Sequence, residues 1–92
     1  WIRPMYLHPA HVTDRLIATW ARARVVPYLD MPVQHGDDGI LRAMRRGVTA
    51  RRMKEILIGF REAIPGVTIR TTVLVGFPGE SEAAFDTLLA FV

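Results

Sequence analysis

Two polar loops carry the residue types most able to bind a ligand, and each directly follows an apolar run. The first loop is Gln34-His35-Gly36, and the second is the segment 76–81, Gly-Phe-Pro-Gly-Glu-Ser. The amide and imidazole of the first could contact a sugar hydroxyl, a carboxylate or a substrate. The two glycines of the second would let a flat ligand such as a base approach the backbone closely. Because ligands of open α/β sheets bind at the carboxyl ends of the strands, we expect both loops to lie in one site.

The second loop superficially resembles a phosphate-binding loop, since it joins a buried strand to a helix start, where backbone N–H groups point outward. It lacks the Gly-Lys-Ser/Thr ending of such loops, which makes a triphosphate site a poor interpretation. Taken alone, a plain tight turn between a strand and a helix explains this segment as well as a base-binding role does.

Two arginines have the chemistry that suits a carboxylate. Arg46 and Arg70 each present a rigid guanidinium fork. Residues two apart in a strand share a face, which places Arg70 on the same side as Thr72. If that side lines the inside of a curved sheet, Arg70 needs a partner, either Asp30 or a ligand carboxylate, and the sequence leaves both open.

The residues His8, His11 and Asp14 have a spacing like that of metal ligands. A turn and a helix start separate them, so we predict capping and surface roles and no metal site. The chain contains no cysteine, which excludes disulfides and any cysteine-ligated metal within these residues.

Apolar runs alternate with helical patterns along the chain, which is typical of an α/β fold. We predict strands over residues 1–7, 28–33 and 67–75, and helices over residues 13–24, 38–44, 49–64 and 81–92. The candidate N-caps are Thr13, Asp37 or Asp38, Thr49 and Ser81. Gly47 is expected to end the second helix. The order of elements with short connections predicts right-handed crossovers and a parallel sheet.

The longest predicted helix carries an apolar stripe that is expected to face the core, formed by Met53, Ile56, Leu57, Phe60 and Ile64. Three strands cannot close a barrel or protect their own edges, so we expect neighbouring strands outside these residues. Since the chain begins with tryptophan and ends within a helical pattern, we interpret it as an internal fragment.

The formal net charge of +3 comes with one local cluster of arginines, at positions 42, 45, 46, 51 and 52. This cluster is either a surface that contacts RNA or a solvated helical face, and no aromatic residues interleave it. No apolar run is long enough to cross a membrane and no leader resembles a signal peptide, so we expect a soluble, cytoplasmic protein.

Taken together, the loops and their flanking residues resemble the radical S-adenosylmethionine methylthiotransferase family over essentially the whole chain. The resemblance rests on Trp1-Ile2-Arg3, Tyr6, Pro9 and the segments 32–36, 40–46 and 75–80. Gln34-His35 and Arg70-Thr71 are similar to the RimO-type branch, which modifies an aspartate of small-subunit ribosomal protein twelve. The tRNA-modifying MiaB-type branch usually has Gln-Ser and an aspartate at position 72, and it stays the alternative.

This resemblance implies that residues 1–92 are part of a TIM-like barrel within a radical S-adenosylmethionine core domain. It implies S-adenosylmethionine as cofactor and two [4Fe-4S] clusters, one of them in a separate N-terminal domain. The cysteine ligands of both clusters, and a C-terminal domain resembling RNA-binding domains, would lie outside this chain, so we expect the fragment alone to be inactive. By the same resemblance, Gln34 contacts the ribose, Arg46 the methionine carboxylate and the backbone of residues 76–80 the adenine.

The cofactor-binding residues implied by the resemblance are Gln34, Arg46, Thr72, Gly76, Phe77, Gly79 and Glu80, and the candidate substrate contacts are His35 and Arg70. No catalytic residue is assigned. The implied partners are the ribosomal protein or the ribosome and a protein reductant. Two alternatives stay open: a tRNA adenosine methylthiotransferase, and a basic RNA- or ribosome-binding module without catalysis that uses the surface of residues 42–52.

Overall fold

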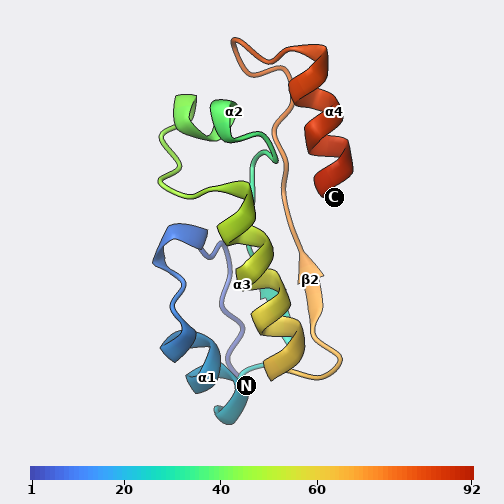
Figure 1. The fold of residues 1–92 in the computed structure, drawn as a ribbon. Helices are drawn as coiled ribbons and strands as arrows, with labels where there is room; N and C mark the ends of the chain where they lie inside the picture. The colour runs from blue at the N-terminus through green and yellow to red at the C-terminus, as the bar shows by residue number, and fades with distance from the viewer.

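Four α-helices, one 3-10 helix and two strands follow one another in the computed structural model, which describes residues 1–92. In chain order they are η1 (Pro9–His11), α1 (Asp14–Arg22), β1 (Tyr28–Asp30), α2 (Asp38–Ala43), α3 (Ala50–Ala63), β2 (Thr68–Arg70) and α4 (Glu82–Phe91). All four predicted helices are present. α1, α3 and α4 begin and end within two residues of their expected limits, whereas α2 ends at Ala43, before its expected end at Gly47. The molecule measures 42 × 21 × 19 Å, with α1 and α4 toward opposite ends (Figure 1).

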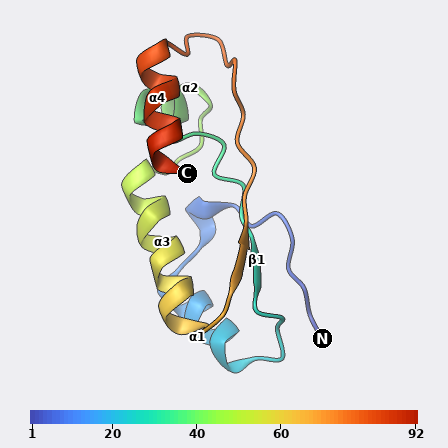
Figure 2. The same cartoon turned by 90° about the vertical axis from the view of Figure 1, so that its right-hand side faces the viewer.

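The two strands, β1 and β2, form a parallel sheet. The register pairs Tyr28 with Thr68, Leu29 with Ile69 and Asp30 with Arg70. Figure 2 shows α3 and α4 on the same side of the strands. The predicted α/β class with parallel strands is therefore confirmed.

The predicted first strand, residues 1–7, is not a regular strand. It makes a single parallel bridge, from Ile2 to Val25, and the N–H of Leu7 donates to a carbonyl of β1 at 2.9 Å. Between these two points Pro4 has no N–H to donate, and Tyr6 adopts a left-handed φ of 56°. The segment therefore runs along β1 but cannot continue a hydrogen-bonded ladder.

Both remaining strands are shorter than predicted because a side chain takes the place of the backbone in their ladder. The hydroxyl of Thr71 donates to the Met31 carbonyl at 3.0 Å and accepts from the Val33 N–H at 3.2 Å. Pro32, between those two partners, offers no donor. Regular pairing ends at residues 30 and 70, and it resumes as one parallel bridge from Gln34.

The core lies between β1 and the helices. Alternate residues Leu29, Met31 and Val33 are fully buried and share one hydrophobic cluster with α1 and α3. From α3, the predicted stripe supplies buried Met53, Ile56 and Phe60 and partly buried Leu57 and Ile64, which confirms that this face is the core face. The Phe60 ring packs edge-on against Trp20 of α1, with ring centroids 5.3 Å apart. Burying each large side chain stabilises the fold by roughly 1.5–3 kcal/mol.

Each α-helix begins where a side-chain oxygen satisfies a free backbone N–H. The caps are Thr13, Asp37, Thr49 and Ser81, each of which accepts from the N–H three residues ahead. These bonds confirm the predicted N-caps and show that Asp37, and not Asp38, is the N-cap of α2. Such caps typically contribute about 1 kcal/mol each.

Candidate functional site

The carboxyl ends of the two strands meet, as the sequence predicts. Gln34 and Val73 form a parallel bridge, in which the Gln34 N–H donates to the Thr72 carbonyl at 3.0 Å. The Leu74 N–H donates to the Gln34 carbonyl at 2.7 Å. Gln34 adopts a left-handed φ of 69°, an uncommon conformation for a residue other than glycine. This bridge places the backbone of Gln34, where the first polar loop begins, beside Thr72 and Val73, which precede the second loop.

The loop of residues 76–80 is held by glycines with positive φ. Gly76 has a φ of 75° and Gly79 a φ of 91°, and no heavy atom lies within 4 Å of where a Cβ would stand on either. The Glu80 N–H donates to the Phe77 carbonyl at 2.9 Å and closes the turn. The loop therefore presents open backbone that a flat ligand can approach.

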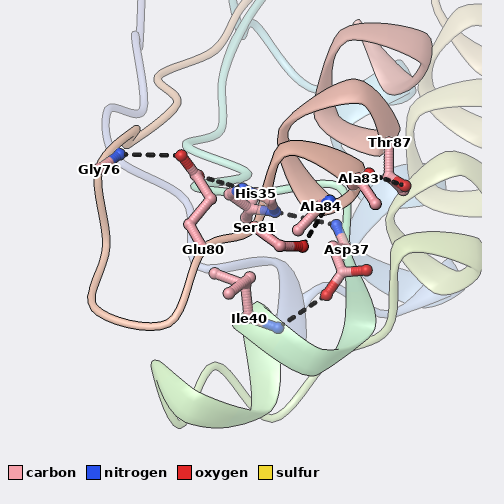
Figure 3. Close-up of polar contacts among 9 residues, drawn as sticks. All are labelled: His35, Asp37, Ile40, Gly76, Glu80, Ser81, Ala83, Ala84 and Thr87. Carbon is pink, nitrogen blue, oxygen red and sulfur yellow. Dashed lines mark hydrogen bonds and ion pairs between the residues drawn. The ribbon is translucent and has the colours of Figure 1, made fainter.

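His35 joins the first loop to the second, as Figure 3 shows. Its ring is fully buried, and its Nδ1 accepts a hydrogen bond from the Asp37 N–H at 3.0 Å. Since Nδ1 is an acceptor, these partners assign the proton to Nε2, which lies 2.7 Å from Oε2 of Glu80 and donates to it. Both ring nitrogens thus have partners within the protein.

The Glu80 carboxylate has two donors. Its Oε1 accepts from the Gly76 N–H at 3.1 Å, and its Oε2 accepts from His35. The hydrogen bond from Gly76, followed by the one from His35, lowers the pKa of the Glu80 carboxyl. Glu80 is therefore an ionised group that links the two loops.

Arg46 is positioned by the end of α2. The helix ends at Ala43 because Arg45 takes the left-handed conformation, with φ of 55°, and the Arg46 N–H reaches back to the Leu41 carbonyl at 3.0 Å. The predicted end at Gly47 is therefore wrong, although Gly47 also has a positive φ.

The Arg46 guanidinium lies against the chain that follows β1. Its Nη2 donates to the Pro32 carbonyl at 2.8 Å, and its Nε is buried without a partner. Burial lowers the pKa of Arg46, and burial followed by the charge of Arg46 lowers the pKa of His8. The only hydrogen-bond acceptor that this half-buried guanidinium has in the structure is the Pro32 carbonyl.

Arg70 forms the ion pair that the sequence left as one of two possibilities. Its Nη1 lies 3.8 Å from Oδ2 of Asp30, and the two residues are register partners on β2 and β1. The Asp30 carboxylate is buried and neither oxygen has a hydrogen-bond donor, while 52% of the Arg70 side chain is exposed. Asp30 therefore pairs with Arg70, whose side chain remains about half exposed to solvent.

Most of the predicted site residues form one connected group, and the two arginines are placed separately. The bridge and the Glu80 bonds bring together Gln34, His35, Thr72 and the loop of residues 76–80. Arg46 contacts the chain after β1 through its hydrogen bond to the Pro32 carbonyl, and Arg70 precedes Thr72 by two residues in the sequence. Sequence reasoning missed the structural use of the Thr71 hydroxyl, because a threonine in a β-rich run carries no signal that it will enter the ladder.

The basic cluster at positions 42–52 is partly neutralised in the structure. Arg51 pairs with Glu55 at 3.0 Å, and Arg52 lies 3.5 Å from Glu55 and 3.8 Å from Asp14. RNA contact stays a prediction. In the structure, no group of three or more histidine, cysteine or acidic residues could hold a metal ion, and no helix is long and apolar enough to cross a membrane.

Comparisons with known proteins agree on one family. The model of the radical SAM superfamily matches residues 2–92. The whole chain is 47% identical to a protein of Protochlamydia amoebophila, of which it covers 20%, and 46% identical to one of Thermotoga petrophila, of which it covers 22%. A protein of an Anaeromyxobacter species is 48% identical, again over the whole chain and 20% of that protein. All three are called ribosomal protein uS12 methylthiotransferase RimO. The chain therefore belongs to the radical SAM superfamily, and its similarity to these proteins confirms the methylthiotransferase resemblance predicted from its sequence.

Proposed function

We propose that this chain forms the S-adenosylmethionine-binding section of a partial TIM-like barrel in a protein that transfers a methylthio group to an aspartate of ribosomal protein uS12. The chain spans about a fifth of the length of the relatives it matches, and their names carry the substrate part of the proposal. The ribosomal protein or ribosome is then the substrate partner, and a protein reductant supplies electrons.

The observation that carries the proposal is the bridge between the carboxyl ends of the strands. It sets the backbone of Gln34 beside Thr72 and Val73, on the segment that leads into the open loop beginning at Gly76. We assign Gln34 and Thr72 to the ribose, and the backbone of residues 76–80, with Phe77, to the adenine. The glycine positions favour this, since nothing fills the space beside them.

Arg46 is assigned to the methionine carboxylate. Its Nη2 is already fixed by the Pro32 carbonyl, which holds the guanidinium in one orientation, and its buried Nε lacks an acceptor. A carboxylate bound at the remaining N–H groups of this half-buried guanidinium would offset the partial burial of its charge. The substrate contact is assigned to Arg70, because both nitrogens of the other candidate, His35, already have protein partners.

The iron–sulfur clusters do not fit the residues of this chain. Cluster ligands are cysteine thiolates, and the chain has none. Its residues also form no alternative group of metal-binding side chains. The role of this chain is therefore to bind and orient the cofactor.

The test compares two arginine variants in the full-length protein that carries these residues. Arg46→Ala should weaken S-adenosylmethionine binding by roughly 10- to 150-fold, because a hydrogen bond to a charged group contributes about 1.5–3 kcal/mol. The control is Arg51→Ala, whose side chain is exposed and pairs with Glu55. Titration calorimetry measures both affinities, and thermal unfolding separates loss of the Pro32 contact from loss of binding. Equal affinities in the two variants would contradict the carboxylate role.

A further inference from the structure

We propose that His35 is a positioning residue, which acts through Glu80 to hold the loop of residues 76–80 in the conformation that receives the ligand. This inference rests on the proposed function, in which the backbone of that loop binds the adenine. It gives His35 a role different from substrate contact.

The ring of His35 has a fixed orientation. The ring is fully buried, and the Asp37 N–H occupies Nδ1 at 3.0 Å. Asp37 is itself the N-cap of α2, so its backbone is held by the helix start. The imidazole therefore directs its Nε2–H at Glu80 from a rigid support.

Glu80 joins both ends of its own loop. Its carboxylate accepts from the Gly76 N–H, at the first residue of the loop, and from His35, across 45 residues of sequence (Figure 3). The His35 side chain and the Gly76 backbone each use a different carboxylate oxygen. The loop is thereby tied to His35, in the polar loop that follows β1.

The loop itself has few contacts that fix its conformation. Gly76 and Gly79 have wide conformational freedom, and nothing packs where their side chains would be. Apart from the turn bond from Glu80 to Phe77, the polar contacts of the loop pass through the Glu80 carboxylate. Without the imidazole, the carboxylate would lose its support and the loop would be ordered only on binding, at a cost in affinity.

Two substitutions separate the two hydrogen bonds of the imidazole. His35→Asn keeps an acceptor near the position of Nδ1 for Asp37 but removes the donor to Glu80. His35→Gln has a reach that returns an N–H donor to the position of Nε2 but removes the acceptor for Asp37. The two variants thus differ in which contact they keep, while both replace a buried aromatic ring.

The experiment uses the full-length protein with S-adenosylmethionine as the probe. We expect His35→Asn to weaken binding about tenfold or more, and His35→Gln to restore affinity to within about threefold of the original protein. Hydrogen–deuterium exchange of residues 74–80 should be faster in the free His35→Asn protein, because the Gly76 N–H loses its fixed acceptor. The His35→Gln protein should keep the original exchange rate in this segment.

Each result of the binding and exchange experiments leads to a different conclusion. An unmodified protein that does not bind S-adenosylmethionine overturns the proposed function itself. If it binds, and the asparagine and glutamine variants lose affinity equally, His35 is only a structural core residue and the positioning role is wrong. Binding and exchange unchanged in His35→Asn would also overturn the role. Faster exchange confined to residues 74–80, together with rescue by glutamine, would support it.

Discussion

Replacing Thr71 with valine tests whether its hydroxyl completes the sheet. The two side chains have nearly the same shape, so the substitution exchanges the hydroxyl for a methyl group and leaves the packing volume almost unchanged. The hydroxyl makes two hydrogen bonds, at 3.0 Å to the Met31 carbonyl and at 3.2 Å from the Val33 N–H. Thr71→Val therefore removes both bonds at once.

The magnitude follows from the burial of the two partners. Met31 and Val33 are fully buried, so their backbone groups have no water to replace the hydroxyl. Each buried group left without a partner costs about 1–3 kcal/mol, and for the two groups we expect a combined loss of about 2–6 kcal/mol in the free energy of unfolding. Thr71→Ser is the matched control, because it keeps the hydroxyl and should cost about 1 kcal/mol or less.

Urea denaturation followed by the fluorescence of Trp20, which is buried against Phe60, measures this difference. The midpoint should fall in Thr71→Val with an unchanged dependence on urea, since the surface exposed on unfolding stays the same. If valine destabilises the protein no more than serine does, the Thr71 hydroxyl is not needed to satisfy the Met31 and Val33 backbone groups. That result would refute its role in the ladder.

Three further predictions concern the core, the loop link and the packing of α4. Phe60→Ala should reduce the free energy of unfolding by about 3–5 kcal/mol, whereas Phe60→Leu should cost less; chemical denaturation measures both. The pKa of the Glu80 carboxyl is lowered from its ordinary value of 4.5. Its ionised form therefore stabilises the folded state at pH values above 4.5, and this stabilisation is lost as the pH falls below 4.5 and through the lowered pKa. Thermal midpoints of the original protein and Glu80→Gln should therefore differ by a constant amount near neutral pH and converge in acid; a difference independent of pH would contradict the link. Gly36→Ala should loosen α4, because its Cβ would stand 2.6 Å from the Phe91 Cβ; limited proteolysis at the end of the chain checks this, and equal cleavage rates would refute it.

The helices could be predicted because their signals are local. Thr13, Thr49 and Ser81 cap them through bonds to N–H groups three residues away, and the stripe ending at Ile64 follows the helical period. The meeting of the two polar loops could also be predicted, since it follows from parallel strand topology.

The remaining features gave no signal in the residue types, and two of them depend on contacts between residues far apart in the sequence. The strands end early because Thr71 bonds to residues 38 and 40 positions away. The second helix ends before Gly47 because Arg45 adopts the left-handed conformation itself. The fixed partner of Arg46 is a backbone carbonyl, which every residue possesses, so no residue type could indicate it.

The left-handed backbone conformation of Gln34 lowers thermal stability, while the side chain of the same residue is the one assigned to bind the ligand. A residue with a Cβ at a φ of 69° costs roughly 1–2 kcal/mol relative to glycine, which adopts this conformation freely. Selection in the laboratory for heat resistance alone would therefore favour glycine at position 34, and would remove the amide assigned to the ribose. A thermostable variant of this protein should accordingly be selected for binding in the same round.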